Sequence, residues 1–159
     1  MFKRLLVSMS LALLSGGFSA HALAADAAAI PATYDASLAA KVGADEHGMR
    51  HYVMVILKTG PKQAPPGPER DAMFKGHFAN IQRLASEGKL ALAGPFEDKN
   101  DWRGMFVFAV EDVETAKQLV ATDPVVIEGE MVPEFHKYYG SAALMLVNEF
   151  HEKVQKQGF

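Results

Sequence analysis

Two polar residues in apolar surroundings are the strongest candidates for chemistry in this sequence. His77 lies in the segment KGHFANIQRLASEGKLALAGPF (75–96), where helical spacing puts it on the flank of an apolar stripe. Histidine titrates near neutral pH, so a histidine in a cleft can act as a general acid or base. The alternative is a half-buried histidine that bonds to a backbone carbonyl.

Asp123 is the second candidate, within the sequence Thr-Asp-Pro. An aspartate before proline commonly bonds its own backbone in a turn. If two helices cover one face of a sheet, the start of the first and the end of the second can lie close together. A carboxylate there would bond one imidazole nitrogen of His77, fix its tautomer and raise the basicity of the other nitrogen, as in catalytic triads.

The elements that must position this pair follow the order β-α-β-β-α-β. Strands are expected at 51–58, 89–96, 104–110 and 126–137 from β-branched runs and turn signals. One helix is expected from Asp71, as its N-cap, to Glu87, and a second from Glu111 to just before Asp123. Pro133 places the fourth strand at an edge or a bulge.

This order predicts an α+β protein with the ferredoxin-like βαββαβ arrangement. The first and third strands are apolar at odd and even positions alike, so both faces of the sheet need cover. Two helices cover one face only. We therefore expect the C-terminal segment or a second subunit to close the other, and predict a homodimer through the sheet face.

The ends of the chain predict an exported protein. Residues 1–24 have a basic start, a short apolar run and a small-x-small site at Ala24, as in a secretory signal peptide. A leader with a short helix at 34–42 is expected in 25–49, the domain in 50–140, and an added helix in 141–159 with Ser141 as its cap. An exported chain without cysteine fits the periplasm.

Charge and composition narrow the expected partners. The first 24 residues hold two of the 16 basic and none of the 19 acidic residues, which leaves the remainder at −5. Without a basic cluster, this acidity argues against nucleic acid and anionic membranes. Small molecules remain the expected ligands.

The chain also resembles a known family. The run HFANIQRLASEGKLALAGP (77–95) followed by ATDP (121–124) is similar to the YCII-related, YciI-like family of dimeric α/β-barrel proteins, akin in fold to muconolactone isomerase. The resemblance covers about residues 50–140 and implies that His77 and Asp123 form that family's proposed active-site pair. One branch of the family eliminates chloride from a chlorinated hydroxyhydroquinone.

Five further residues are candidates for substrate binding. They are Phe78, Gly94, Pro95, Arg103 and Tyr138. A glycine at the end of a strand lets a ligand approach the backbone, an arginine can hold an anion, and a tyrosine can donate to a phenolic ligand. Turn, solvated-charge and packing roles are the alternatives. We expect a pocket lined by Phe78, Met54, Phe106 and Tyr138, with the proline-rich loop 61–69 as a lid.

No cofactor or metal is expected. His51 and His136 fall on strands that should be neighbours, but two ligands are too few for a site, and no phosphate-binding glycine motif is present. The sequence thus predicts a cofactor-independent lyase or isomerase that uses His77 and Asp123 on a small molecule, phenols included. The alternative is a non-catalytic ligand-binding or scaffold protein.

Overall fold

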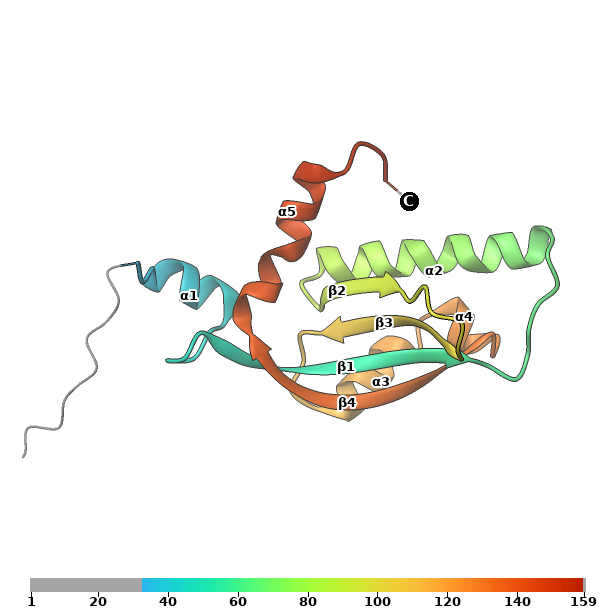
Figure 1. Ribbon diagram of the computed structural model, residues 1–159, viewed down its shortest axis with the longest axis horizontal. Helices are drawn as coiled ribbons and strands as arrows, with labels where there is room; N and C mark the ends of the chain where they lie inside the picture. Colours follow the sequence, from blue (N-terminus) through green and yellow to red (C-terminus); the bar gives the residue numbers. More distant parts are fainter. Residues whose placement is uncertain (1–32, 159) are drawn as a thin grey trace, which may run out of the picture. The chain divides into compact units, whose positions relative to one another are not determined.

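The computed structural model describes residues 33–158, and its helices and strands all lie in the unit that begins at Asp35 (Figure 1). Four antiparallel strands form one sheet in the order β2-β3-β1-β4. They are β1 (Met49–Thr59), β2 (Leu90–Pro95), β3 (Trp102–Phe108) and β4 (Met131–Ser141). The predicted signal peptide and the first part of the predicted leader, residues 25–32, lie outside the described residues.

Five α-helices and one 3-10 helix accompany the sheet within residues 33–158. They are α1 (Ala36–Val42), α2 (Pro68–Ser86), α3 (Val113–Val120), α4 (Pro124–Ile127), η1 (Ala142–Leu146) and α5 (Val147–Val154). The crossover from β1 to β2 is α2, and the crossover from β3 to β4 is α3 with α4. This α+β arrangement confirms the ferredoxin-like fold.

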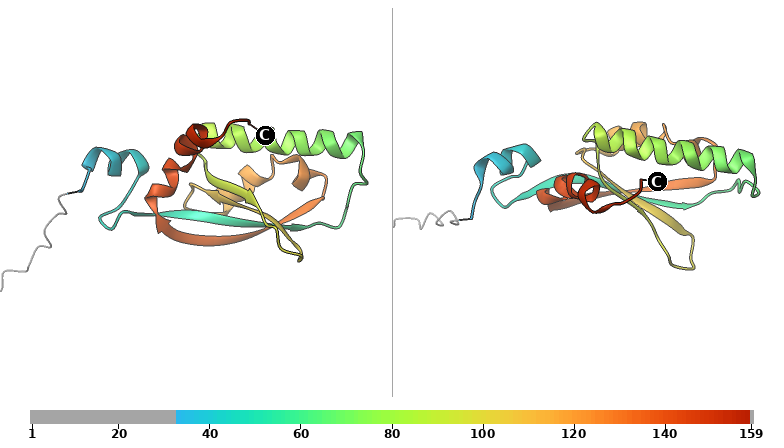
Figure 2. Two further views of the ribbon diagram at one scale, coloured as in Figure 1. Left: turned by 45° about the horizontal axis from the view of Figure 1, so that its top comes forward. Right: turned by 90° about the horizontal axis from the view of Figure 1, so that it is seen from above.

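The main core lies between one face of the sheet and the helices α2, α3 and α4 (Figure 2). Three alternate residues in the middle of β1 point to this face, and all three are buried: Val53, Val55 and Leu57. They meet Leu84 of α2 and Val120 of α3. Both crossover helices therefore cover the same face, as the predicted topology required.

The opposite face has its own smaller core. Tyr52 and Val107 are buried there against Leu144 and Met145 of η1. Because η1 covers only part of this face, Met54 remains partly exposed. The polypeptide after β4 thus covers part of the sheet face that the two crossover helices leave open.

Helix α2 starts three residues before the predicted N-cap. It begins at Pro68 after Gly67, and Asp71 lies within its first turn instead of capping it. The prediction failed because proline is preorganised for the first helical position, so the helix extends into a stretch that was expected to be loop. Gly88 does stop it, at φ 67°.

The fourth strand starts later than predicted. Residues 124–127 form α4, and β4 runs from Met131 to Ser141, not from 126 to 137. Pro124 at the first helical position starts that turn, and Gly129, at φ 77°, ends it. Pro133 does lie on an edge strand, because β4 is the last strand of the sheet among residues 33–158 and pairs there with β1 alone.

The predicted C-terminal helix is divided in two. Ser141 belongs to β4 and caps η1, its hydroxyl accepting the Ala143 N–H at 3.3 Å. The α-helical part, α5, then covers only Val147–Val154. Its Asn148 side chain donates to the Leu90 carbonyl of β2 at 2.7 Å, which ties the C-terminal segment to the edge of the sheet.

Candidate functional site

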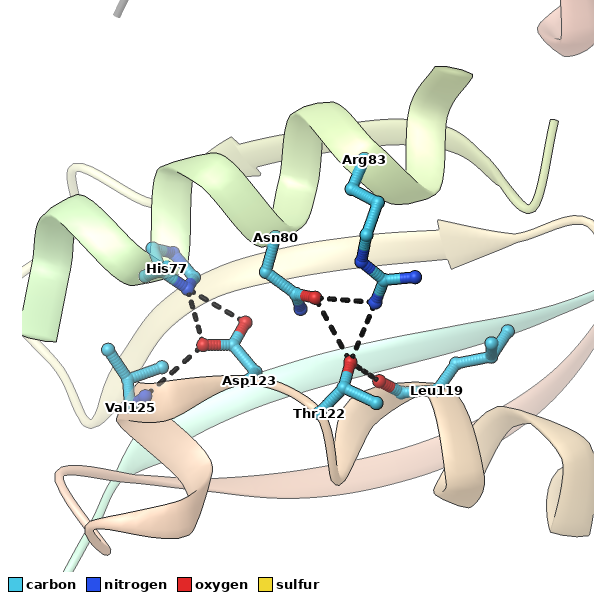
Figure 3. Close-up of polar contacts among 7 residues, drawn as sticks. All are labelled: His77, Asn80, Arg83, Leu119, Thr122, Asp123 and Val125. Carbon is cyan, nitrogen blue, oxygen red and sulfur yellow. Dashed lines mark hydrogen bonds and ion pairs between the residues drawn. The ribbon is translucent and has the colours of Figure 1, made fainter. Parts of the chain in front are cut away.

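A buried histidine–aspartate pair lies between α2 and the turn before α4 (Figure 3). The Nδ1 of His77 is 2.9 Å from Oδ1 and 2.8 Å from Oδ2 of Asp123. His77 is 8% exposed and Asp123 0%. A carboxylate only accepts, so Nδ1 is the donor of this contact, and Nε2 takes no part in it.

Local structure places each partner of the pair. His77, Asn80 and Leu84 are the residues that α2 buries, one turn apart on the side that faces the sheet. Asp123 is the N-cap of α4, and its Oδ1 also accepts the Val125 N–H at 3.2 Å. Its carboxylate therefore caps a helix and orients an imidazole at the same time.

Three phenyl rings surround the imidazole. Ring centroids lie 6.0 Å away for Phe74, 5.4 Å for Phe78 and 6.0 Å for Phe106. Phe106 comes from β3 and the other two from α2. Phe78 is 40% exposed, so the cluster reaches solvent there. Carbon atoms of aromatic rings therefore make up much of the surroundings of His77.

A hydrogen-bonded network adjoins the pair, and the sequence did not reveal it. The Asn80 Oδ1 accepts from Arg83 Nη2 at 2.7 Å and from Thr122 Oγ1 at 3.0 Å (Figure 3). An arginine can only donate, so the Asn80 oxygen must face it and the Nδ2 must face away. That buried Nδ2 has no partner in residues 33–158. The network holds Thr122, and with it the backbone entering Asp123.

The sequence of this region identifies the family. A family model for the YCII-related domain matches residues 51–133, which include both His77 and Asp123. The chain belongs to the YCII-related family.

Among solved structures, the YCII-related domain is similar to 5-chloro-2-hydroxyhydroquinone dehydrochlorinase (TftG) from Burkholderia phenoliruptrix AC1100, in complex with 2,5-dihydroxybenzoquinone. The two chains are 18% identical with a TM-score of 0.36, over 54% of this chain and 90% of that one. No curated protein matches the sequence.

Two of the residues expected in the pocket lie on the other face of the YCII-related sheet. Tyr138 pairs with Tyr52 across the strands and lies against its ring at 6.1 Å, on the face that η1 covers. Met54 faces the same way, whereas Phe106 faces His77. The predicted lining by Met54 and Tyr138 is corrected, because successive residues of a strand alternate between faces.

Gly94 and Pro95 close β2 opposite Met105 and Gly104 of β3. Nothing lies within 4 Å of the position that a Cβ would take at Gly94, so no part of the described chain requires a glycine there.

An open hollow of about 410 Å³ beside α2 is lined by Phe74 and Phe78 among others, and His77 is not among its lining residues.

Arg103 does not extend freely into solvent from its hairpin. The register of β1 and β3 shifts between Leu57 and Lys58, so Arg103 has no register partner on β1, while its carbonyl accepts the Phe96 N–H at 3.1 Å. Its Nη1 lies 3.9 Å from Glu130 Oε1 and donates to Gln63 Oε1 at 3.3 Å. Glu130 is 0% exposed, and its Oε1 also forms an ion pair with Arg70 Nη2 at 3.1 Å.

Glu130 is a buried carboxylate that the sequence analysis missed. Burial raises its pKa, but the Ala64 N–H and the guanidiniums of Arg70 and Arg103 outweigh that effect and bring the pKa below its usual value. The only sequence signal was a glutamate directly before a strand, which by itself indicates nothing.

The loop expected to act as a lid is tied down at its start. Gly60 and Lys62 donate backbone N–H groups to the carbonyls of Glu130 and Gly129, and Gln63 Nε2 donates to the Glu130 carbonyl at 2.8 Å. These bonds fix 60–64 against the residues that precede β4. Only Pro65, Pro66 and Gly67 of the loop then lie between these bonds and the start of α2 at Pro68.

The two strand histidines weighed as metal ligands are not opposite one another. His51 pairs with Tyr139 and His136 with Met54, and His136 bonds Glu134 at 2.8 Å. Within residues 33–158, no three His, Cys, Asp or Glu side chains gather closely enough to hold a metal ion. The same residues contain no helix long and apolar enough to cross a membrane.

Proposed function

We propose that this YCII-related protein is an enzyme in which His77 and Asp123 carry out cofactor-independent acid–base chemistry of the lyase or isomerase type. The observation that supports this most is the contact between His77 Nδ1 and both Asp123 oxygens inside an apolar cluster. The substrate class is small planar molecules, phenols among them, which fit beside the rings of Phe74, Phe78 and Phe106.

In this mechanism, His77 Nε2 takes a proton from the substrate. Asp123 keeps the proton on Nδ1 and stabilises the imidazolium that forms. In an elimination the electron pair left on the substrate expels a leaving group. In an isomerisation Nε2 returns the proton to another atom. Such general acid–base help is typically worth about 10²–10⁴-fold in rate.

A thermal-shift screen of small planar molecules would supply candidate substrates, because a ligand of the native state raises its apparent stability. With a substrate in hand, His77→Gln should reduce kcat at least about 100-fold. His47→Gln, at an exposed histidine, should leave it unchanged. Full turnover by His77→Gln would exclude this mechanism.

A second candidate is a non-catalytic ligand-binding protein of the same fold. The 8% exposure of His77 favours it, because a substrate needs access to Nε2. Imidazole titration followed by NMR separates the two. A His77 signal that moves with pH and with added phenol supports catalysis, whereas one that moves with neither supports a structural role.

We also propose that two copies associate through the sheet face that η1 covers only in part. Met54 and Met105 are partly exposed there, and Tyr138 is 40% exposed. Sedimentation should give a dimer at micromolar concentration, and Met54→Lys should shift it toward monomer. A wild-type monomer would contradict this proposal.

We place the protein in the periplasm, on the signal-like sequence of residues 1–24 alone. Mass spectrometry of the protein from a periplasmic extract should find an N-terminus near Ala25. An intact Met1 would contradict this location.

A further inference from the structure

Two arginines from distant parts of the chain meet at one buried carboxylate. Arg70 lies in the first turn of α2, Arg103 in β3, and Glu130 directly before β4. Glu130 Oε1 is 3.1 Å from Arg70 Nη2 and 3.9 Å from Arg103 Nη1, while Oε2 accepts the Ala64 N–H at 2.8 Å. We call these three side chains the arginine cluster.

The arginine cluster has more positive than negative charge. One carboxylate faces two guanidiniums, which leaves about one net positive charge in a chain that is acidic overall. The arginine side chains are 30% and 28% exposed, whereas that of Glu130 is 0% exposed. A guanidinium has five N–H donors, and one shared carboxylate oxygen uses few of them.

The arginine cluster adjoins the His77 site through one ring. The Arg70 guanidinium lies 4.4 Å over the centroid of Phe74. The same ring packs edge-on against His77 at 6.0 Å. A positive group and a proton-transfer group therefore share Phe74 as a neighbour.

We propose that Arg70 and Arg103, held in place by Glu130, bind the anionic group of an aromatic acid whose ring lies beside Phe74 and Phe78. This inference rests on the proposed function and narrows its substrate class from small planar molecules to planar anions. A guanidinium pairs with a carboxylate through two parallel N–H···O bonds, which fix both distance and orientation. Glu130 prevents the two arginines from separating through mutual repulsion.

Benzoate and benzamide are suitable probes, since they share one shape and differ in charge. Calorimetric titration should show benzoate binding at least about tenfold more tightly than benzamide, as charge-assisted pairs allow. Arg70→Gln and Arg103→Gln should each remove most of that preference. Lys117→Gln, which loses the same charge from the exposed face of α3, should keep it. Equal affinity for the two probes, or a preference that survives both arginine changes, would overturn the proposal.

Two further variants test the proposal if the glutamine variants do not fold. If a glutamine variant fails to fold, Arg103→Lys retains a positive charge near Glu130 but not the planar fork. Its preference for benzoate should fall at least about threefold, and an unchanged preference would count against the proposal. His77→Gln should keep the benzoate preference. If it also keeps full turnover, the acid–base mechanism fails while the anion site stands.

Discussion

At the scale of single residues, Asp123 combines two roles that are usually separate. It caps α4 and orients His77, and it does both from a fully buried position. An exposed N-cap such as Asp112 of α3 has only the first role. The chain thus offers an internal comparison between a cap alone and a cap that is also part of a site.

We expect Asp123→Ala to cost about 2–4 kcal/mol of unfolding free energy, because it removes a cap and leaves the buried His77 without its partner. Asp112→Ala should cost only about 1 kcal/mol. Asp123→Asn can still cap α4, so it should cost about 1 kcal/mol and still lose most turnover. Urea denaturation measures all three, and equal costs for the two alanine variants would contradict a structural contribution from the His77 bond.

At the scale of elements, the arginine cluster depends on how closely the segment after β1 approaches the segment before β4. A Cβ at Gly60 would lie 2.2 Å from the Gly129 carbonyl oxygen. The cause is the pair of backbone bonds that join 60–62 to 129–130. The position of Glu130, and of both arginines around it, follows from this approach.

Gly60→Ala should therefore destabilise the protein by about 2–3 kcal/mol, because a backbone atom cannot move aside as a side chain can. Gly94→Ala is the control. Nothing lies within 4 Å of its Cβ position, so its cost should stay below about 0.5 kcal/mol. Thermal unfolding of both variants tests this, and a neutral Gly60→Ala would refute the close approach.

The elements also show what a sequence can predict. Runs of β-branched and other apolar residues, bounded by turn signals, located β1 and β3, and the element order predicted the shared face of α2 and α3. The pair of His77 with Asp123 followed from that topology. Met54 and Tyr138 were misplaced because the choice of face depends on register, which residue types alone do not determine. Glu130, Arg70 and Asn80 were missed because no motif or element boundary marks them, and their partners lie 60 and 42 positions away along the chain.

At the scale of the whole molecule, Glu130 makes the free energy of unfolding depend on pH, because its partners come from separate elements of the tertiary fold. Its pKa is lowered on folding, so its contribution to stability is complete above its unfolded value of 4.5 and is lost as the pH falls through the folded value. The wild-type stability should decline in this range partly because the ties to Ala64, Arg70 and Arg103 weaken together.

Glu130→Gln should therefore lower stability most near pH 7 and progressively less toward pH 3. The two curves of unfolding free energy against pH should converge at the acid end. Glu46→Gln, at an exposed carboxylate, should run parallel to the wild type. Chemical denaturation at several pH values provides the curves. A constant difference in unfolding free energy between Glu130→Gln and wild type would show that the Glu130 carboxylate does not contribute to the pH dependence of stability.

The two edge strands of the sheet, β2 and β4, have a consequence for aggregation at high protein concentration. An edge strand has unpaired backbone N–H and C=O groups that can bond to a strand of another molecule. On β2 the Leu90 carbonyl is already occupied by Asn148, and on β4 Pro133 has no N–H while Glu134 and Lys137 carry charges. Growth into an open-ended ribbon by the addition of strands at either edge of the sheet is thereby disfavoured.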